Sequence, residues 1–282
     1  MLQKNLKYFL LFGFLFLLSG CSATKLFYDY GDLVVSWKLD SYFDLNSEQE
    51  DWVEERVRLH LEWHRKTELP TYRLFLIDLQ NSAKDGLSKQ ELDQLFFDFE
   101  EKRDRIFERL IPDSAVFLST LSTEQINSLE REMAEENKEL IKELENPELR
   151  LQKREKNFWA QMEDWFGKFS QSQRKEISVL HTKWLTETPD PLAERLQRRR
   201  ISQPQFLALL RSSPDNAQLE NWFRSWFLSW EGENNAAREK RLQRNKKRIM
   251  LVDQLLTAEQ RLHAVRELDD WIDVLEQTII DH

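Results

Sequence analysis

The sequence is poor in cysteine and glycine, and these two shortages exclude several classes of protein. Cys21 is the only cysteine among 282 residues, so the chain cannot form a disulfide within itself. Only four glycines follow residue 20, and no two of them are close together in the sequence: Gly31, Gly86, Gly167 and Gly232. Phosphate-binding loops and nucleophile elbows need clustered glycines. The sequence therefore argues against nucleotide-binding proteins and serine hydrolases of those types.

Basic residues are fewer than acidic residues. The chain has 41 lysines and arginines against 50 acidic residues, which gives a net charge of −9. Residues 1–20 contain two lysines and no acidic residue, so without them the net charge would be −11. Nucleic-acid binding depends on a strongly basic surface. We therefore expect no nucleic-acid partner.

The N-terminus holds one short apolar run. Lys4 and Lys7 are followed by an uncharged stretch over residues 8–18. A helix needs about 20 apolar residues to cross a bilayer, so this run is too short and is typical of a secretory signal peptide. It ends in Leu18-Ser19-Gly20-Cys21, which resembles the bacterial lipobox.

The resemblance to a lipobox implies a specific fate for the N-terminus. Residues 1–20 would be removed, and Cys21 would carry a diacylglyceryl group and an amide-linked acyl chain. Ser22 rather than aspartate follows the cysteine, which implies sorting to the periplasmic face of the outer membrane. The alternative is an ordinary secretory signal with an incidental cysteine.

Beyond the signal, the hydrophobic pattern is helical. Apolar residues recur at helical spacing over 88–112, 122–145 and 257–281, and no stretch alternates polar and apolar residues like a strand. Charged residues make up 32% of the chain and fill the opposite faces. The sequence predicts an all-α, multi-helix bundle of nine to eleven helices.

Six short segments have the pattern of a helix-capping box. In each, an apolar residue precedes Ser, Thr or Asn, and Gln or Glu follows three residues later. Two further helix starts have proline at the first helical position, at 146–147 and 213–214. The six predicted caps are Asn46, Ser88, Ser122, Ser170, Ser202 and Thr257.

The predicted domain organisation is simple. Residues 21–30 form a short lipidated segment, and helical sequence begins by about Gly31. Residues 31–282 form the helical domain, with a candidate subdomain break near 187–191, where two prolines stop a helix. No Ser/Gly-rich tether follows Cys21, so we expect the folded body to sit close to the bilayer.

An aromatic stripe is one candidate interaction surface. Trp222, Trp226 and Trp230 are four residues apart, which places them on one helix face. An exposed stripe would offer a platform for unfolded peptide or acyl chains. The alternative interpretation is a helix buried on a broad apolar face.

A basic segment over residues 238–248 is the second candidate. It contains seven basic residues and one acidic residue, and Arg241, Arg244 and Lys247 are among them. Such a segment suits lipopolysaccharide phosphates, anionic lipid or an acidic protein. The alternative is pairing within the chain with the acidic helix over residues 130–143.

Two histidines are the only candidates for metal or catalytic chemistry. His60 and His64 have the i, i+4 spacing that can share a zinc ion. Leu61 stands where a metalloprotease has its general base, and no motif supplies a third ligand. We therefore expect no catalytic residue, metal or cofactor.

Several segments carry a resemblance to a known family. Residues 40–45, 63–72, 121–125, 135–137 and 256–260 resemble an uncharacterised family of Gram-negative lipoproteins. That resemblance implies a lipid-anchored helical protein of the cell envelope, and the family has no assigned activity.

A second resemblance involves the repeated Leu-(Ser/Thr)-x-x-Gln signature. Leu121 to Gln125 and Leu256 to Gln260 are similar to segments of small periplasmic stress chaperones, which are helical and bind unfolded clients without ATP. The function expected first is a non-enzymatic, outer-membrane-anchored binding or scaffolding module with a protein partner. An anchored ATP-independent chaperone is the alternative, and a metal-dependent enzyme is the third.

Overall fold

The structure, a computed structural model, describes residues 20–228 and 235–280, and every element in these ranges is a helix. The predicted all-α fold is therefore confirmed. The elements are α2 (Gly20–Phe43), α3 (Ser47–Trp63), the π-helical turn η3 (His64–Glu68), α4 (Leu69–Ala83), α5 (Lys89–Ser119), α6 (Thr123–Leu144), α7 (Pro147–Phe166), α8 (Gln171–Glu187), α9 (Pro191–Arg211), α10 (Asn216–Leu228), α11 (Asn235–Asp253) and α12 (Ala258–Ile280).

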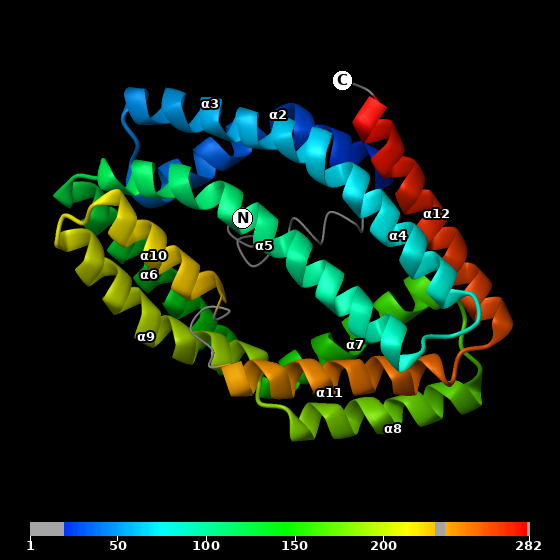
Figure 1. The fold of residues 1–282 in the computed structure, drawn as a ribbon. Coiled ribbons are helices and arrows are strands. Elements are labelled where there is room, and N and C mark those ends of the chain that lie inside the picture. The colour runs from blue at the N-terminus through cyan, green and yellow to red at the C-terminus, as the bar shows by residue number, and fades with distance from the viewer. Residues whose placement is uncertain (1–19, 229–234, 281–282) are drawn as a thin grey trace.

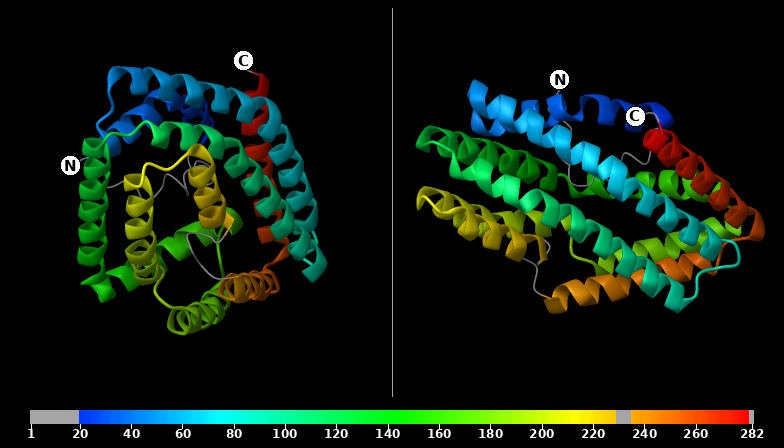
Figure 2. Two further views of the ribbon diagram at one scale, coloured as in Figure 1. Left: turned by 60° about the vertical axis from the view of Figure 1, so that its left-hand side comes forward. Right: turned by 45° about the horizontal axis from the view of Figure 1, so that its top comes forward.

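Most of the helices lie around the outside of the molecule, and α5 crosses its middle (Figure 1). In that view α2, α3 and α4 form the upper edge, α12 descends beside α4, and α11 and α8 form the lower edge. Helix α5 runs across the molecule. Helices α6, α9 and α10 lie together near the end of α5 that is remote from α12. The turned views in Figure 2 keep α2 on the outside, close to the end of α12.

Three apolar clusters hold this arrangement together. The first joins α2, α3, α5, α6, α9 and α10 around Ala115 and Leu219, both fully buried. The second joins α4 to α12 around Leu69 and Leu268. The third joins α7 and α8 around Ile177, with part of α11 packed against it. The loop at 188–190 separates α8 from α9, and the first two clusters each contain buried residues from both sides of it.

Five of the six predicted capping boxes are confirmed. At Asn46, Ser88, Ser122 and Ser170 the cap side chain accepts from the N3 amide, and the N3 side chain accepts from the cap amide. Thr257 exchanges the same two hydrogen bonds with Gln260, at 3.0 and 3.2 Å. These bonds satisfy amides that have no partner inside the helix and so fix the helix starts.

The sixth predicted box, at Ser202, is wrong, because α9 continues through it from Pro191 to Arg211. Leu196 and Phe206 flank the expected start, and both are buried, so one continuous helix buries both. The side-chain oxygen of Gln203, inside the predicted box, accepts from Asn137 of α6 at 2.7 Å, so this stretch of α9 contacts a neighbouring helix. Tertiary contacts therefore override a pattern that is locally favourable for a helix start.

Two further helix starts were predicted from proline. The start at 146–147 is confirmed, since the Asn146 side chain accepts from the Leu149 amide and Pro147 begins α7. The start at 213–214 is displaced, because α10 begins at Asn216. Its cap is Asp215, which exchanges two hydrogen bonds with Gln218. That box has an acidic cap, and the sequence interpretation missed it.

Candidate functional site

The predicted lipidation site lies at the start of α2. This helix begins at Gly20 and includes the backbone of Cys21. The expected start near Gly31 was therefore too late, and residues 21–30 belong to the helix. The side chain of Cys21 lies outside the described part of the chain, and its lipidation stays a prediction. From Tyr28 onward α2 packs against the body, where Phe43 belongs to the first cluster and Tyr28 to the second. The helix is thus part of the folded body.

The two histidines lie where α3 passes into the π-helical turn, and the fold does not bring them together for metal binding. His60 Nε2 lies 2.9 Å from Asp113 Oδ2, a close contact without the alignment of a hydrogen bond. His64 Nδ1 lies 2.5 Å from the Tyr28 hydroxyl on α2. Among the described residues no group of three His, Cys, Asp or Glu side chains could hold a metal ion.

Burial decides the charge state of these side chains. Burial lowers the pKa of His64 to about 4, so its imidazole is neutral and its Nδ1 can accept a hydrogen bond from the Tyr28 hydroxyl. Burial raises the pKa of Tyr28, which keeps the phenol protonated. Burial also lowers the pKa of His60, although Asp113 opposes that shift. The contact between Tyr28 and His64 therefore joins α2 to η3 through two neutral polar groups.

Glu68 ends the π-helical turn and is fully buried. Its Oε1 accepts from Arg105 Nη2 of α5 at 2.8 Å, whereas Oε2 has no hydrogen-bond partner. Tyr72 lies near enough for the Glu68 charge to add to the effect of burial, and together they raise the pKa of its phenol. π-Helical turns often occur at functional sites, because the extra residue redirects side chains. Here the turn directs Glu68 inward, and the sequence interpretation did not single it out.

The tryptophan stripe faces the interior as far as it is described. The Trp222 ring stacks on Phe206 of α9 with the centroids 4.3 Å apart, and on Trp226 at 5.7 Å. Phe227 of the same helix stacks on Phe107 of α5 at 4.0 Å. Trp222 and Trp226 are partly buried, and Trp230 lies outside the described residues. The described part of the stripe fits the interpretation of a packed helix face.

The basic segment lies on α11, and several of its charges are paired within the fold. Arg238 pairs with Glu100 at 2.5 Å, and Lys246 pairs with Asp93 at 2.7 Å. Both partners lie on α5. The predicted pairing of this segment with the acidic helix α6 is therefore wrong for these two residues. Arg248 donates to the Trp184 carbonyl at 3.3 Å and to the Thr188 hydroxyl.

The three basic residues singled out from the sequence differ in exposure. Lys247 is exposed, whereas Arg241 and Arg244 are partly buried. The acidic residues of α6 have other basic partners. Glu136 pairs with Arg199 at 3.1 Å, and Glu130 pairs with Arg211 at 2.5 Å.

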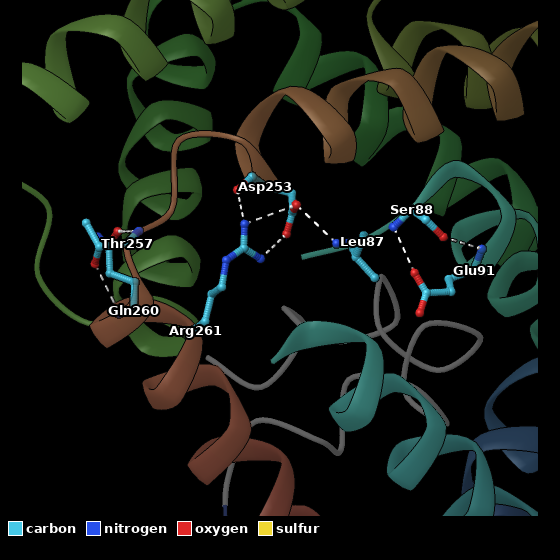
Figure 3. Close-up of polar contacts among 7 residues, drawn as sticks. All are labelled: Leu87, Ser88, Glu91, Asp253, Thr257, Gln260 and Arg261. Atoms are coloured by element: carbon cyan, nitrogen blue, oxygen red, sulfur yellow. Dashed lines mark hydrogen bonds and ion pairs between the residues drawn. The ribbon is translucent and has the colours of Figure 1, made fainter. Parts of the chain in front are cut away.

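A polar junction links the starts of α5 and α12 to the end of α11 (Figure 3). Asp253 accepts from the Leu87 amide at 3.1 Å and from Arg261 Nη1 at 2.5 Å. Gly86, at φ +104°, lies against Arg261, so a side chain there would be both strained and crowded. Asp253 at the end of α11 thus binds groups near the starts of α5 and α12, which gives the junction a structural role.

An open groove of about 530 Å³ lies between α6 and α9. Its lining is mostly apolar and includes one arginine: Ile141, Leu144, Ala193, Leu196, Gln197 and Arg200. It contains no carboxylate, histidine, serine or cysteine, so it offers no group for nucleophilic or acid–base chemistry.

Comparison with known proteins matches the chain to a family. No curated protein and no solved structure matches the chain significantly. The model of a family of unknown function, DUF6279, matches residues 41–231, which is more than half of the chain. The match covers α3 to α10 and includes the π-helical turn with His64 and Glu68. The protein therefore belongs to the DUF6279 family.

Proposed function

We propose that this protein is a non-enzymatic lipoprotein of the cell envelope, anchored through Cys21 to the periplasmic face of the outer membrane. In this proposal the helical body is a binding or scaffolding module. The single observation that carries it is the continuity between the lipobox and α2, because that helix runs from Gly20 to Phe43 and packs into the body. The anchor would hold a firmly packed body beside the membrane.

The partners of the reactive side chains support a role without catalysis. His64 contacts Tyr28, and Glu68 pairs with Arg105. Asp253 accepts hydrogen bonds from groups near the starts of α5 and α12. These groups bind to one another across helices, and the open groove between α6 and α9 holds none of them. Their arrangement favours a stable framework over a reaction centre.

The chaperone alternative has less support from the fold. Its best surface was the tryptophan stripe, and Trp222 packs against Phe206 in the first cluster. Capping boxes of the Leu-(Ser/Thr)-x-x-Gln form also have a structural explanation here, since Gln125 and Gln260 both cap helices. The fold therefore favours a scaffold over a chaperone.

The anchor is tested by the mass of the mature protein. Membranes of cells that make the full chain are extracted, and the N-terminal peptide is analysed by mass spectrometry after feeding with an alkyne fatty acid. We expect a chain that begins at Cys21 and carries the acyl label. In the matched control, Cys21→Ala, the label should be absent. An unlabelled wild-type chain would refute the anchor.

The binding role is tested by photo-crosslinking in intact cells. A photoreactive amino acid replaces Val179, Ile201 or Leu262, which are each more than half exposed and lie on three different helices. A scaffold should give one stoichiometric crosslinked product, confined to one or two positions. Many unrelated products would support the chaperone, and the absence of any product from every position would count against both.

A further inference from the structure

Helix α2 carries a stripe of exposed apolar side chains. We define the stripe as Tyr30, Leu33, Val34 and Trp37, which are 52%, 52%, 43% and 64% exposed. Their i, i+3, i+4, i+7 spacing places all four on one face of the helix. An exposed cluster of this kind, with two aromatic residues, marks an interaction surface.

The stripe cannot turn inward, because the opposite face of α2 is already packed. Gly31 is buried and lies so close to Leu61 that an added Cβ would approach its side chain to 3.0 Å. Ser36 is 2% exposed and Phe43 is 7% exposed. The contact between Tyr28 and His64 holds the N-terminal part of α2 in the same orientation. The four residues are therefore held outward by the fold.

No charged residue interrupts the stripe. Asp32 lies between its members in sequence, but its carboxylate accepts from the Leu33 amide at 2.8 Å and it is only partly exposed. Lys38 follows the stripe, and its ammonium group lies over the Tyr42 ring at 4.6 Å from the centroid. The surface thus combines an apolar centre with polar residues at its edges, as in helices that lie in a membrane interface.

The chain that precedes α2 indicates what covers the stripe. The apolar stretch 8–18 and Cys21 come directly before it, and the helix is continuous from Gly20. At 1.5 Å per residue, Tyr30 is about 14 Å and Trp37 about 24 Å along the helix from Cys21. The lipid on Cys21, or the stretch 8–18 if it is not cleaved, would enter the bilayer close to the start of α2. The stripe is within one helix length of this entry point.

We propose that the α2 stripe lies in the headgroup region of the membrane to which Cys21 is anchored. Tyrosine and tryptophan favour this region, where their rings are partly buried and their polar atoms stay hydrated. Among the described helices none is long and apolar enough to cross a membrane, so α2 would lie along the surface. The lipid and the stripe would then form two contacts that fix the orientation of the body. This inference rests on the proposed lipid anchor.

The test uses the purified lipidated full chain with a cysteine introduced at one position. Lipidation consumes the thiol of Cys21, so Leu33→Cys or Val179→Cys provides the only free thiol for an environment-sensitive fluorophore. Val179 is the control, since it is 65% exposed on α8, at the opposite edge of the molecule from α2 (Figure 1). Both labelled proteins are reconstituted in phosphatidylethanolamine–phosphatidylglycerol vesicles.

We expect a blue shift of the label at residue 33 and quenching of its emission by brominated lipids, with neither effect at residue 179. A further Val34→Glu substitution should remove most of the shift at residue 33, while circular dichroism and the urea midpoint stay unchanged. If the two labels behave alike on vesicles that carry the protein, the inference is wrong.

Two controls separate this inference from the proposed function and from self-association. Flotation with the vesicles reports the lipid anchor alone, so a protein that floats but shows no shift at residue 33 retains its anchor and refutes only the stripe. The Cys21→Ser, Leu33→Cys protein is labelled in the absence of lipid and examined by sedimentation. A shifted label together with the mass of a dimer would show that a second copy covers the stripe, and would overturn the inference.

Discussion

The side-chain amides of Gln49 and Gln125 hydrogen-bond to each other across 76 residues of sequence. Gln49 Nε2 donates to Gln125 Oε1 at 3.2 Å, and Gln125 Nε2 donates to Gln49 Oε1 at 2.6 Å. Each glutamine also completes the capping box of its own helix. Gln173 and Gln260 form the same kind of contact between α8 and α12, at 2.8 Å. Each contact joins the starts of two helices.

The first prediction concerns Gln125, which is only 8% exposed. Gln125→Ala should lower the free energy of unfolding by about 2 kcal/mol, because it removes a cap partner and contacts to Gln49 and to the Asp44 carbonyl. Urea unfolding measures the change. The matched control is Gln218→Ala in the exposed box of α10, which should cost only about 0.5 kcal/mol.

A double-mutant cycle then isolates the contact between the glutamines. If Gln49→Ala and Gln125→Ala act through each other, the combined loss should be smaller than the sum of the single losses by more than about 0.5 kcal/mol. Strict additivity would show that the two boxes are energetically independent.

The second prediction concerns the buried Glu68. Arg105→Ala should destabilise the protein by about 3 kcal/mol, since it leaves a fully buried carboxylate without its partner. Arg105 is itself 45% exposed, which places the value at the lower end for buried pairs. A second substitution, Glu68→Gln, should restore part of the lost stability in the Arg105→Ala background. Failure of that rescue in guanidinium unfolding would contradict a charge-based cause.

The third prediction concerns pH. Burial lowers the pKa of His64 to about 4, against 6.5 in the unfolded chain, so the unfolded state binds more protons between these values. The contribution of His64 to stability is complete above pH 6.5 and is lost as the pH falls towards 4. His64→Gln should flatten this part of the stability curve, and an NMR titration of the His64 ring should show an apparent pKa near 4. A midpoint above 6 would contradict the burial.

The fourth prediction tests the packing of the tryptophan stripe. Trp222→Ala should cost about 3 kcal/mol, because the ring stacks on Phe206 and packs against the first cluster. Ile201→Ala is the control on an adjacent helix, and it should change the urea midpoint little, since Ile201 is 58% exposed. A stability loss as small for Trp222 as for Ile201 would revive the interpretation of a free binding surface.

The fifth prediction compares two basic residues of α11. Arg248→Met should lower the free energy of unfolding by about 1 to 2 kcal/mol, because Arg248 donates to the last turn of α8 and to Thr188. Lys247→Met, one residue earlier, should have an effect within about 0.5 kcal/mol, since that side chain is exposed. Equal effects in chemical unfolding would show that general charge, and not the specific contacts of Arg248, matters.

Much of the fold could be predicted from the sequence because the capping signals are local. A cap at Ser88 depends only on Glu91 three residues later, so the pattern itself contains both partners. The box at Ser202 has the same local pattern and is nevertheless inside α9, because Leu196 and Phe206 are buried on either side of it. Distinguishing these cases requires knowledge of what each helix packs against.

The candidate site was less predictable for the same reason. The sequence contains two acidic helices that could pair with α11, and only the fold brings Glu100 and Asp93 of α5 to it. The pairing of Gln49 with Gln125 likewise depends on helix ends that are distant in sequence. A π-helical turn has no simple sequence signature, so nothing marked Glu68 as buried among many exposed carboxylates.

The second apolar cluster cannot be completed before the C-terminal helix is present. Tyr28 of α2 and Leu69 of α4 pack with Leu268 and Leu275 of α12. A ribosome completes α2 and α4 long before it reaches α12, so their apolar faces cannot be covered by their native partner until nearly the whole described chain has been made. A product that stops before Ala258 would leave those faces without their native partner, which makes such a product prone to aggregate.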